Sequence, residues 1–90
     1  MSWSDAVIDE HAFKHGLEAD DIACAWTNYV RKRYRAAPNE GQVVLVGFDR
    51  GGRLIEVIAA EKGFGYVIYH AMEPPTRNVL VELGLIRRTR

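Results

Sequence analysis

The chain has 90 residues, and its 12 basic side chains balance 12 acidic ones to a formal net charge of zero. A chain of this length forms a single domain, which we place at residues 1–90, and its hydrophobic fraction of 48% excludes an intrinsically disordered protein. The lone Cys24 excludes an internal disulfide, and the apolar runs are much shorter than the ~20 residues of a membrane-spanning helix.

The first part of the chain predicts two short helices. Residues 9–15 form the first, and Gly16 stands where a residue in the left-handed conformation ends a helix. Residues 17–28 form the second, because acidic side chains lie in its first turn and Ile22 and Trp26 belong to one apolar stripe. Cys24 is expected to be a small core residue within this helix.

From residue 29 the pattern of apolar residues changes to a period of two, which indicates strands. We expect them at residues 30–36, 43–48, 53–60 and 66–72. The connections have the length of hairpin turns, so the strands form an antiparallel meander of three or four strands. After two prolines, Thr76 begins a short C-terminal helix and Gly84 ends it. The predicted fold class is therefore α+β.

The charges are unevenly distributed along the chain. Residues 1–28 carry six acidic side chains against Lys14, whereas residues 29–90 carry 11 basic and six acidic side chains. The predicted sheet is therefore basic, and such a surface can meet phosphate or an acidic protein partner. Alternatively, the acidic residues 1–28 and the basic residues 29–90 simply neutralise each other's electrostatic field.

Two motifs carry a family resemblance. They are the element Lys14-His15-Gly16-Leu17 before an acidic helix start, and the later hairpin V-L-V-G-F-D-R-G-G-R-L-I-E-V. The chain resembles the BrnT family, toxins of bacterial type II toxin–antitoxin modules with a RelE-like ribonuclease fold. The resemblance covers roughly residues 11–80.

The resemblance implies a RelE/BrnT-like domain that cleaves messenger RNA without a metal or other cofactor. It also implies a cognate antitoxin as partner, with a homodimer or a heterotetramer with the antitoxin as possible assemblies. One departure affects the site: Val67 and Met72 occupy positions at which the family carries arginines, and His70 takes a serine position between them. The nearest later arginine is Arg77, beyond the prolines.

Lys14, His15 and His70 are the candidate catalytic residues. A ribonuclease without a metal needs a base, an acid and a cation near the phosphate, and histidine and lysine fill these roles near neutral pH. His11, Lys14 and His15 can project to one side of the first helix, or they can be a solvated helix end that meets the helix dipole. His70 shares a predicted face with Tyr66, Ile68 and Met72, and it is either catalytic or a half-buried histidine bonded to a carbonyl.

Four arginines are the candidate RNA-binding residues: Arg33, Arg35, Arg53 and Arg77. Arg31, Arg33 and Arg35 alternate along one strand at a spacing of ~6.6 Å, close to that of phosphates in a single strand. Equally, charges of this kind protect an edge strand from aggregation. Arg53 either binds phosphate or closes a hairpin. No pattern of metal ligands occurs, so we expect no metal.

Glu56 stands among apolar neighbours in the third predicted strand. A carboxylate in such surroundings can act as an acid–base group, but a cross-strand ion pair with an arginine is the outcome we expect.

Two functions from different classes remain at this point. The first is a toxin-like endoribonuclease. The second is a non-catalytic RelE-like module whose edge strand binds a protein partner. In both cases we expect a cytoplasmic protein with no membrane association, because no signal peptide is recognisable at the N-terminus.

Overall fold

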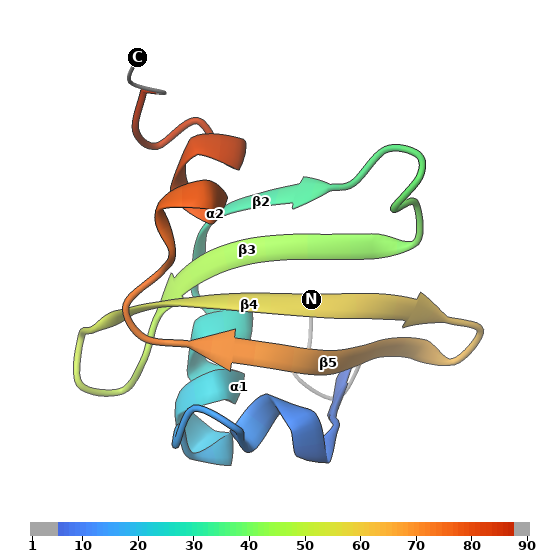
Figure 1. Cartoon of the computed structure of the whole chain (residues 1–90). Coiled ribbons are helices and arrows are strands. Elements are labelled where there is room, and N and C mark those ends of the chain that lie inside the picture. The colour runs from blue at the N-terminus through green and yellow to red at the C-terminus, as the bar shows by residue number, and fades with distance from the viewer. Residues whose placement is uncertain (1–5, 88–90) are drawn as a thin grey trace.

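The computed structural model describes residues 6–87, which form a five-stranded sheet with helices on both faces (Figure 1). The strands are β1 (Ala6–Ile8), β2 (Tyr29–Tyr34), β3 (Gln42–Phe48), β4 (Leu54–Lys62) and β5 (Gly65–Met72), and their order across the sheet is β1-β5-β4-β3-β2. The helical elements are the 3-10 helix η2 (Glu10–Phe13) and the α-helices α1 (Ala19–Thr27) and α2 (Arg77–Glu82). The predicted α+β class is confirmed.

Strands β2 to β5 confirm the four predicted strands, and they pair antiparallel in chain order. The structure corrects the strand count, because β1 pairs with β5 in parallel and makes the sheet mixed. A strand of three residues is too short to display a period of two, and its partner lies near the other end of the chain. Local sequence therefore contains no signal for this pairing.

The first predicted helix is shorter and tighter than expected. Instead of an α-helix over residues 9–15, Glu10–Phe13 form a 3-10 turn whose N-cap, Asp9, accepts a hydrogen bond from the His11 amide. Gly16 follows with a φ of +84°, in agreement with its predicted role as the residue that ends this turn. The second predicted helix is α1, which begins at Ala19 rather than at Leu17.

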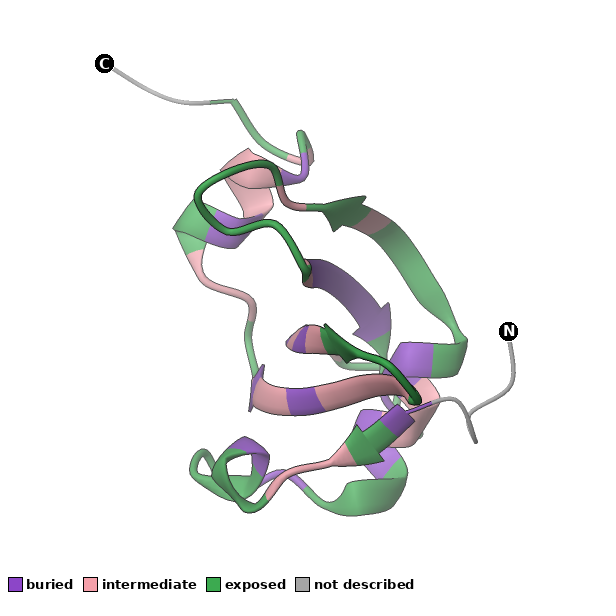
Figure 2. Cartoon of the chain, turned by 90° about the vertical axis from the view of Figure 1, so that its right-hand side faces the viewer, coloured by how far each residue is buried: buried purple, intermediate pink, exposed green. Residues whose placement is uncertain are grey.

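The main core lies between α1 and the sheet. Ile22, Ala25 and Trp26 of α1 are buried against apolar side chains of β3, β4 and β5, in agreement with the predicted apolar stripe. Figure 2 shows the resulting contrast between two neighbouring strands: β3 is buried over most of its length, whereas β2 at the edge is largely exposed.

Helix α2 covers the opposite face through a smaller apolar cluster, whose buried members are Val44, Val46, Val79 and Leu83. Its ends agree with the prediction: Thr76 is the N-cap and accepts a hydrogen bond from the Val79 amide, and Gly84 follows with a φ of +74°. No helix within residues 6–87 is long and apolar enough to cross a lipid bilayer.

Arg50, in the turn between β3 and β4, ties that turn to the start of α1. Its guanidinium donates to the carboxylates of Asp21 and Glu18 at 2.9 and 2.8 Å. The hydrogen bonds from Arg50 lower the pKa of the Asp21 carboxyl, because they favour its ionised form. The acidic start of α1, predicted from the helix dipole alone, therefore also anchors the turn that carries Arg53.

Gly47 of β3 lies directly against the backbone of α1, since a Cβ atom at this position would overlap the carbonyl oxygen of Ala25. We predict that Gly47→Ala lowers the free energy of unfolding by about 1–3 kcal/mol or more, because the helix must move away from the sheet. Gly63 is the matched control, as a Cβ atom there would meet nothing within 4 Å. Urea unfolding followed by circular dichroism measures both variants. Equal midpoints for Gly47→Ala and Gly63→Ala would contradict the close approach.

Candidate functional site

A groove on the face of the sheet that carries α2 collects the titratable side chains singled out above. Its volume is about 470 Å³. The lining residues are His11, Lys14, His15, Ile58, Tyr69 and His70. The structure thus brings together the three candidate catalytic residues, Lys14, His15 and His70, although they come from distant parts of the chain.

The rings of His15 and His70 meet edge to face, with centroids 5.6 Å apart and an interplanar angle of 77°. They meet because η2 is attached to β5: the amide of Asp9 donates to the carbonyl of Ile68 at 2.8 Å. Ala12 of η2 is fully buried in the core, whereas the nearby His11, Lys14 and His15 are exposed and line the groove. The packing of η2 against β5 therefore places Lys14 and His15 close to His70.

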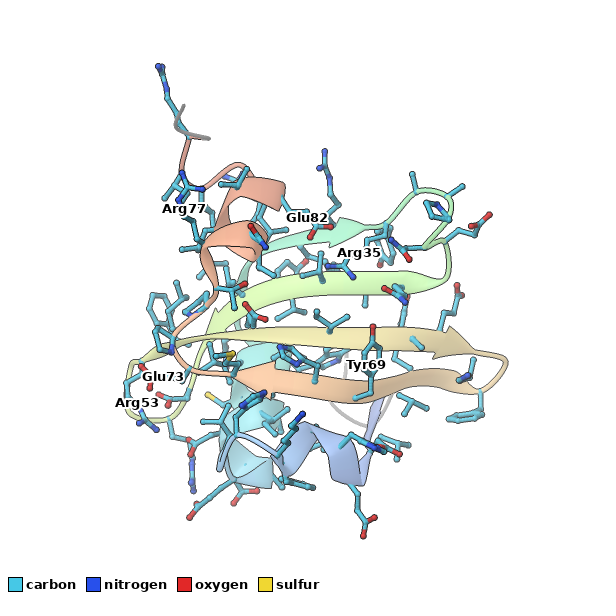
Figure 3. All side chains as sticks on the ribbon, viewed as in Figure 1. Arg35, Arg53, Tyr69, Glu73, Arg77 and Glu82 are labelled. Atoms are coloured by element: carbon cyan, nitrogen blue, oxygen red, sulfur yellow. The ribbon has the colours of Figure 1, made fainter. Side chains whose placement is uncertain are left out.

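A bulge in β5 determines which side chains reach the groove. His70 pairs with Ile58 and Ile68 pairs with Ala59, so Tyr69 is an extra residue opposite the β4 strand. As a result Ile68 is buried in the core on the α1 side, while Tyr69 and His70 both line the groove. Figure 3 shows Tyr69 standing on the front face of the sheet.

This bulge corrects the predicted face of β5. Strict alternation places Ile68 and His70 on one side, but the extra residue puts them on opposite sides. Strict alternation also places Tyr69 on the side opposite His70, so the sequence does not identify Tyr69 as a residue of the groove. No residue in the strand signals the irregularity.

Behind His70 lies Glu56, a β4 residue that is only 2% exposed. Its Oε2 atom is 2.6 Å from Nε2 of His70. Its Oε1 atom accepts hydrogen bonds from the amide and the hydroxyl of Thr76, at 2.7 and 2.9 Å. The prediction that Glu56 forms an ion pair with an arginine is therefore wrong. Its carboxylate binds His70 and Thr76, the N-cap of α2, instead. The strand pattern indicated a buried carboxylate, but not its partner across the sheet.

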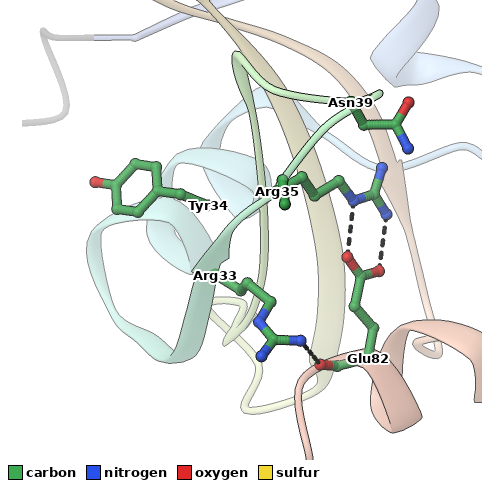
Figure 4. A pocket seen from close by; sticks show the side chains of 6 residues that line it. Arg33, Tyr34, Arg35, Asn39 and Glu82 are labelled. Carbon is green, nitrogen blue, oxygen red and sulfur yellow. Dashed lines mark hydrogen bonds and ion pairs between the residues drawn. The ribbon is translucent and has the colours of Figure 1, made fainter.

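The arginine row, defined as Arg31 and Arg33 of β2 together with Arg35 directly after it, faces the C-terminal end of α2. Arg31 donates to the carbonyl of Leu83 at 2.9 Å, and Arg33 donates to the carbonyl of Glu82 at 3.0 Å. Arg35 binds both carboxylate oxygens of Glu82, at 2.8 and 2.9 Å (Figure 4). The last carbonyls of a helix lack partners within the helix, and arginines near that end satisfy them.

The contact with Glu82 raises the pKa of Arg35, because a hydrogen-bonded carboxylate favours the charged guanidinium, although partial burial acts against it. Two of the candidate RNA-binding residues, Arg33 and Arg35, thus already have hydrogen-bond partners within the protein. A phosphate has to compete with Glu82 and the helix end to reach them.

The other two candidate RNA-binding residues lie toward the end of the sheet at which β5 ends (Figure 3). Arg53 donates to the buried carboxylate of Asp49 at 2.9 Å, so it closes the hairpin, while its side chain stays 56% exposed. It also lines, with His15 and Glu73, a small hollow next to the catalytic candidates. Arg77 lies on α2 and lines a separate hollow with Arg33. Only Arg53 is therefore placed beside the groove.

Within residues 6–87, no group of three or more His, Cys, Asp or Glu side chains is arranged to hold a metal ion. The groove presents nitrogen and phenol groups, with one aliphatic residue, Ile58. Its chemistry is that of proton transfer and of binding to anionic or aromatic groups.

The arginine row predicts a role in stability that can be measured. We expect Arg35→Gln to lower the free energy of unfolding by about 1 kcal/mol, because it removes a paired charge that is partly exposed. Lys62→Gln, at the exposed end of β4, is the control and should leave stability unchanged. Urea unfolding and binding of a single-stranded RNA oligonucleotide are compared for both. Unchanged stability with a large loss of RNA affinity in Arg35→Gln would contradict the structural role.

No protein-family model matches the chain, and no curated protein or solved structure matches it either. The resemblance to BrnT toxins therefore depends on the two short motifs. Both contribute to the site: the first supplies Lys14 and His15 to the groove, and the second supplies Glu56, which lies against His70.

Proposed function

We propose that this protein is a metal-independent endoribonuclease, the toxin of a type II toxin–antitoxin module, which cleaves messenger RNA in the groove around His70. The observation that carries the proposal is the meeting of His15 and His70, 5.6 Å apart, beside Lys14 in one groove. Such a set of side chains supplies every proton transfer that RNA cleavage requires.

In this chemistry a base removes the proton of a ribose 2′-hydroxyl, and the oxygen attacks the adjacent phosphorus. The bond to the 5′-oxygen breaks, and an acid gives that oxygen a proton, so the products carry a 2′,3′-cyclic phosphate and a 5′-hydroxyl. His15 and His70 share the acid and base roles. The ammonium of Lys14 stabilises the negative charge that develops on the phosphate oxygens.

The groove also suits single-stranded RNA. Tyr69 offers an aromatic surface on which an unpaired base can stack. Arg53, partly exposed next to His15, can bind a neighbouring phosphate. These contacts need an extended strand, because a paired duplex does not present its bases to side chains.

A non-catalytic RelE-like protein-binding module is the second candidate, favoured by the edge strand β2. Tyr29 and Tyr34 are exposed there, and the ammonium of Lys32 lies 4.5 and 5.5 Å from their ring centroids. An edge strand can pair with a strand of another protein. Under the first proposal the same edge is available to the antitoxin.

The proposal predicts cleavage of single-stranded RNA by the purified protein in the presence of EDTA. We expect His15→Gln, His70→Gln and Lys14→Met each to lower the cleavage rate about 10²- to 10⁴-fold, because each removes one proton-transfer or charge-stabilising group. Lys62→Met is the control for the loss of a lysine and should cleave like the wild type. Circular dichroism verifies that every variant is folded.

An RNA with a single 2′-deoxy nucleotide at the cleaved position tests the chemistry, since it lacks the attacking oxygen and should stay intact. Induced expression of the wild type should arrest growth, and the three groove variants should not. Intact RNA at a large excess of folded wild-type protein, together with normal growth, would refute the nuclease and favour the binding module.

A further inference from the structure

We propose that Glu56 is a positioning residue that holds neutral His70 with its proton on Nε2, which makes Nδ1 the base of the reaction. The inference rests on the proposed ribonuclease function and specifies which histidine, and which atom, begins the chemistry.

The hydrogen bonds around Glu56 define its role as an acceptor. The Thr76 amide can only donate, so Oε1 accepts from it. The Thr76 hydroxyl accepts a bond from the Val79 amide, which leaves its own hydrogen for Oε1. With Oε1 occupied by these two donors, the remaining hydrogen to assign lies between Oε2 and Nε2 of His70, which are 2.6 Å apart. Imidazole is a stronger base than a carboxylate, so this hydrogen belongs to Nε2 and Glu56 binds as an anion. Nε2 is therefore the donor in that contact.

The state of Nδ1 follows from the state of Nε2. A neutral imidazole has one N–H and one nitrogen with a free lone pair. When Nε2 carries the hydrogen, Nδ1 carries the lone pair and can accept a proton from the 2′-hydroxyl. The imidazolium that forms lies against a buried carboxylate, which stabilises its charge. His70 is thereby the base.

His15 is left with the acid role. It is exposed, and its ring lies edge to face with the ring of His70. An exposed histidine exchanges protons readily with solvent, so it can be protonated again after each turnover.

Glu56 also fastens the first turn of α2, so its replacement has a structural effect that must be separated from the effect on His70. Glu56→Gln makes the separation possible. Since Thr76 presents two donors, the amide oxygen of the glutamine must face Thr76, and its NH₂ group must face Nε2. The NH₂ group donates, so Nε2 becomes the acceptor and the ring hydrogen moves to Nδ1.

Thr76→Val is the matched control. It removes the hydroxyl that binds Glu56 and caps α2, but it keeps the backbone amide and leaves the contact between Glu56 and His70 in place. We expect it to lower the midpoint of urea unfolding as Glu56→Gln does, without changing the tautomer of His70.

Long-range ¹H–¹⁵N spectra of histidine-labelled protein, recorded where the imidazoles are neutral, identify the tautomer of His70 directly. We expect the proton on Nε2 in the wild type and in Thr76→Val, and on Nδ1 in Glu56→Gln. In single-turnover RNA cleavage by folded protein, Glu56→Gln should be slower by about 10²-fold or more, as expected when a base is held in the wrong tautomer, while Thr76→Val keeps its rate.

A wild-type His70 with its proton on Nδ1, or a Glu56→Gln protein that keeps the proton on Nε2, would overturn the inference. Equal losses of cleavage in Glu56→Gln and Thr76→Val would overturn it too, because Glu56 would then act only through α2. The expected tautomers in a wild-type protein that cleaves no RNA would instead refute the proposed function, and with it the role of Nδ1 as a base.

Discussion

The buried carboxylate of Glu56 is the contact on which the site depends, because three elements of the fold meet at it. A carboxylate that is 2% exposed is unfavourable unless hydrogen bonds replace the lost water. Here β4 supplies the charge, β5 supplies His70, and Thr76, the N-cap of α2, supplies two hydrogen-bond donors. The interaction that orients the histidine is therefore also one that places the helix, so the site and the fold share their stability.

Polar contacts also hold the rest of α2 on its face of the sheet. The apolar cluster under α2 is small, as expected in a short chain that can bury only a limited core. Polar contacts hold both ends of the helix instead: Glu56 at its start, and the arginine row at its final carbonyls. The opposite face is different, because α1 packs there on a continuous apolar core in which Gly47 allows close approach.

The features that the sequence could predict are local ones. The period of two and the glycines at turns identified β2 to β5. An acidic first turn with an apolar stripe identified α1, and the Thr76 cap identified α2. Each of these signals involves residues close together in the chain. The bulge at Tyr69, the parallel pairing of β1 and the contact between Glu56 and His70 depend on register between distant strands, which composition does not reveal. The arginines were ambiguous for a chemical reason: a guanidinium binds the oxygens of a phosphate and those of a helix end alike.

We propose that single-stranded RNA binds at the groove between η2 and β5, rather than along the arginine row. Titration of labelled protein with a 2′-deoxy oligonucleotide, which binds without being cleaved, tests it by nuclear magnetic resonance. We expect the imidazole signals of His15 and His70 to shift on binding, and the guanidinium signal of Arg35 to stay unchanged because Glu82 remains bound to it. Shifts confined to β2 and α2, with both histidines unaffected at saturation, would contradict it.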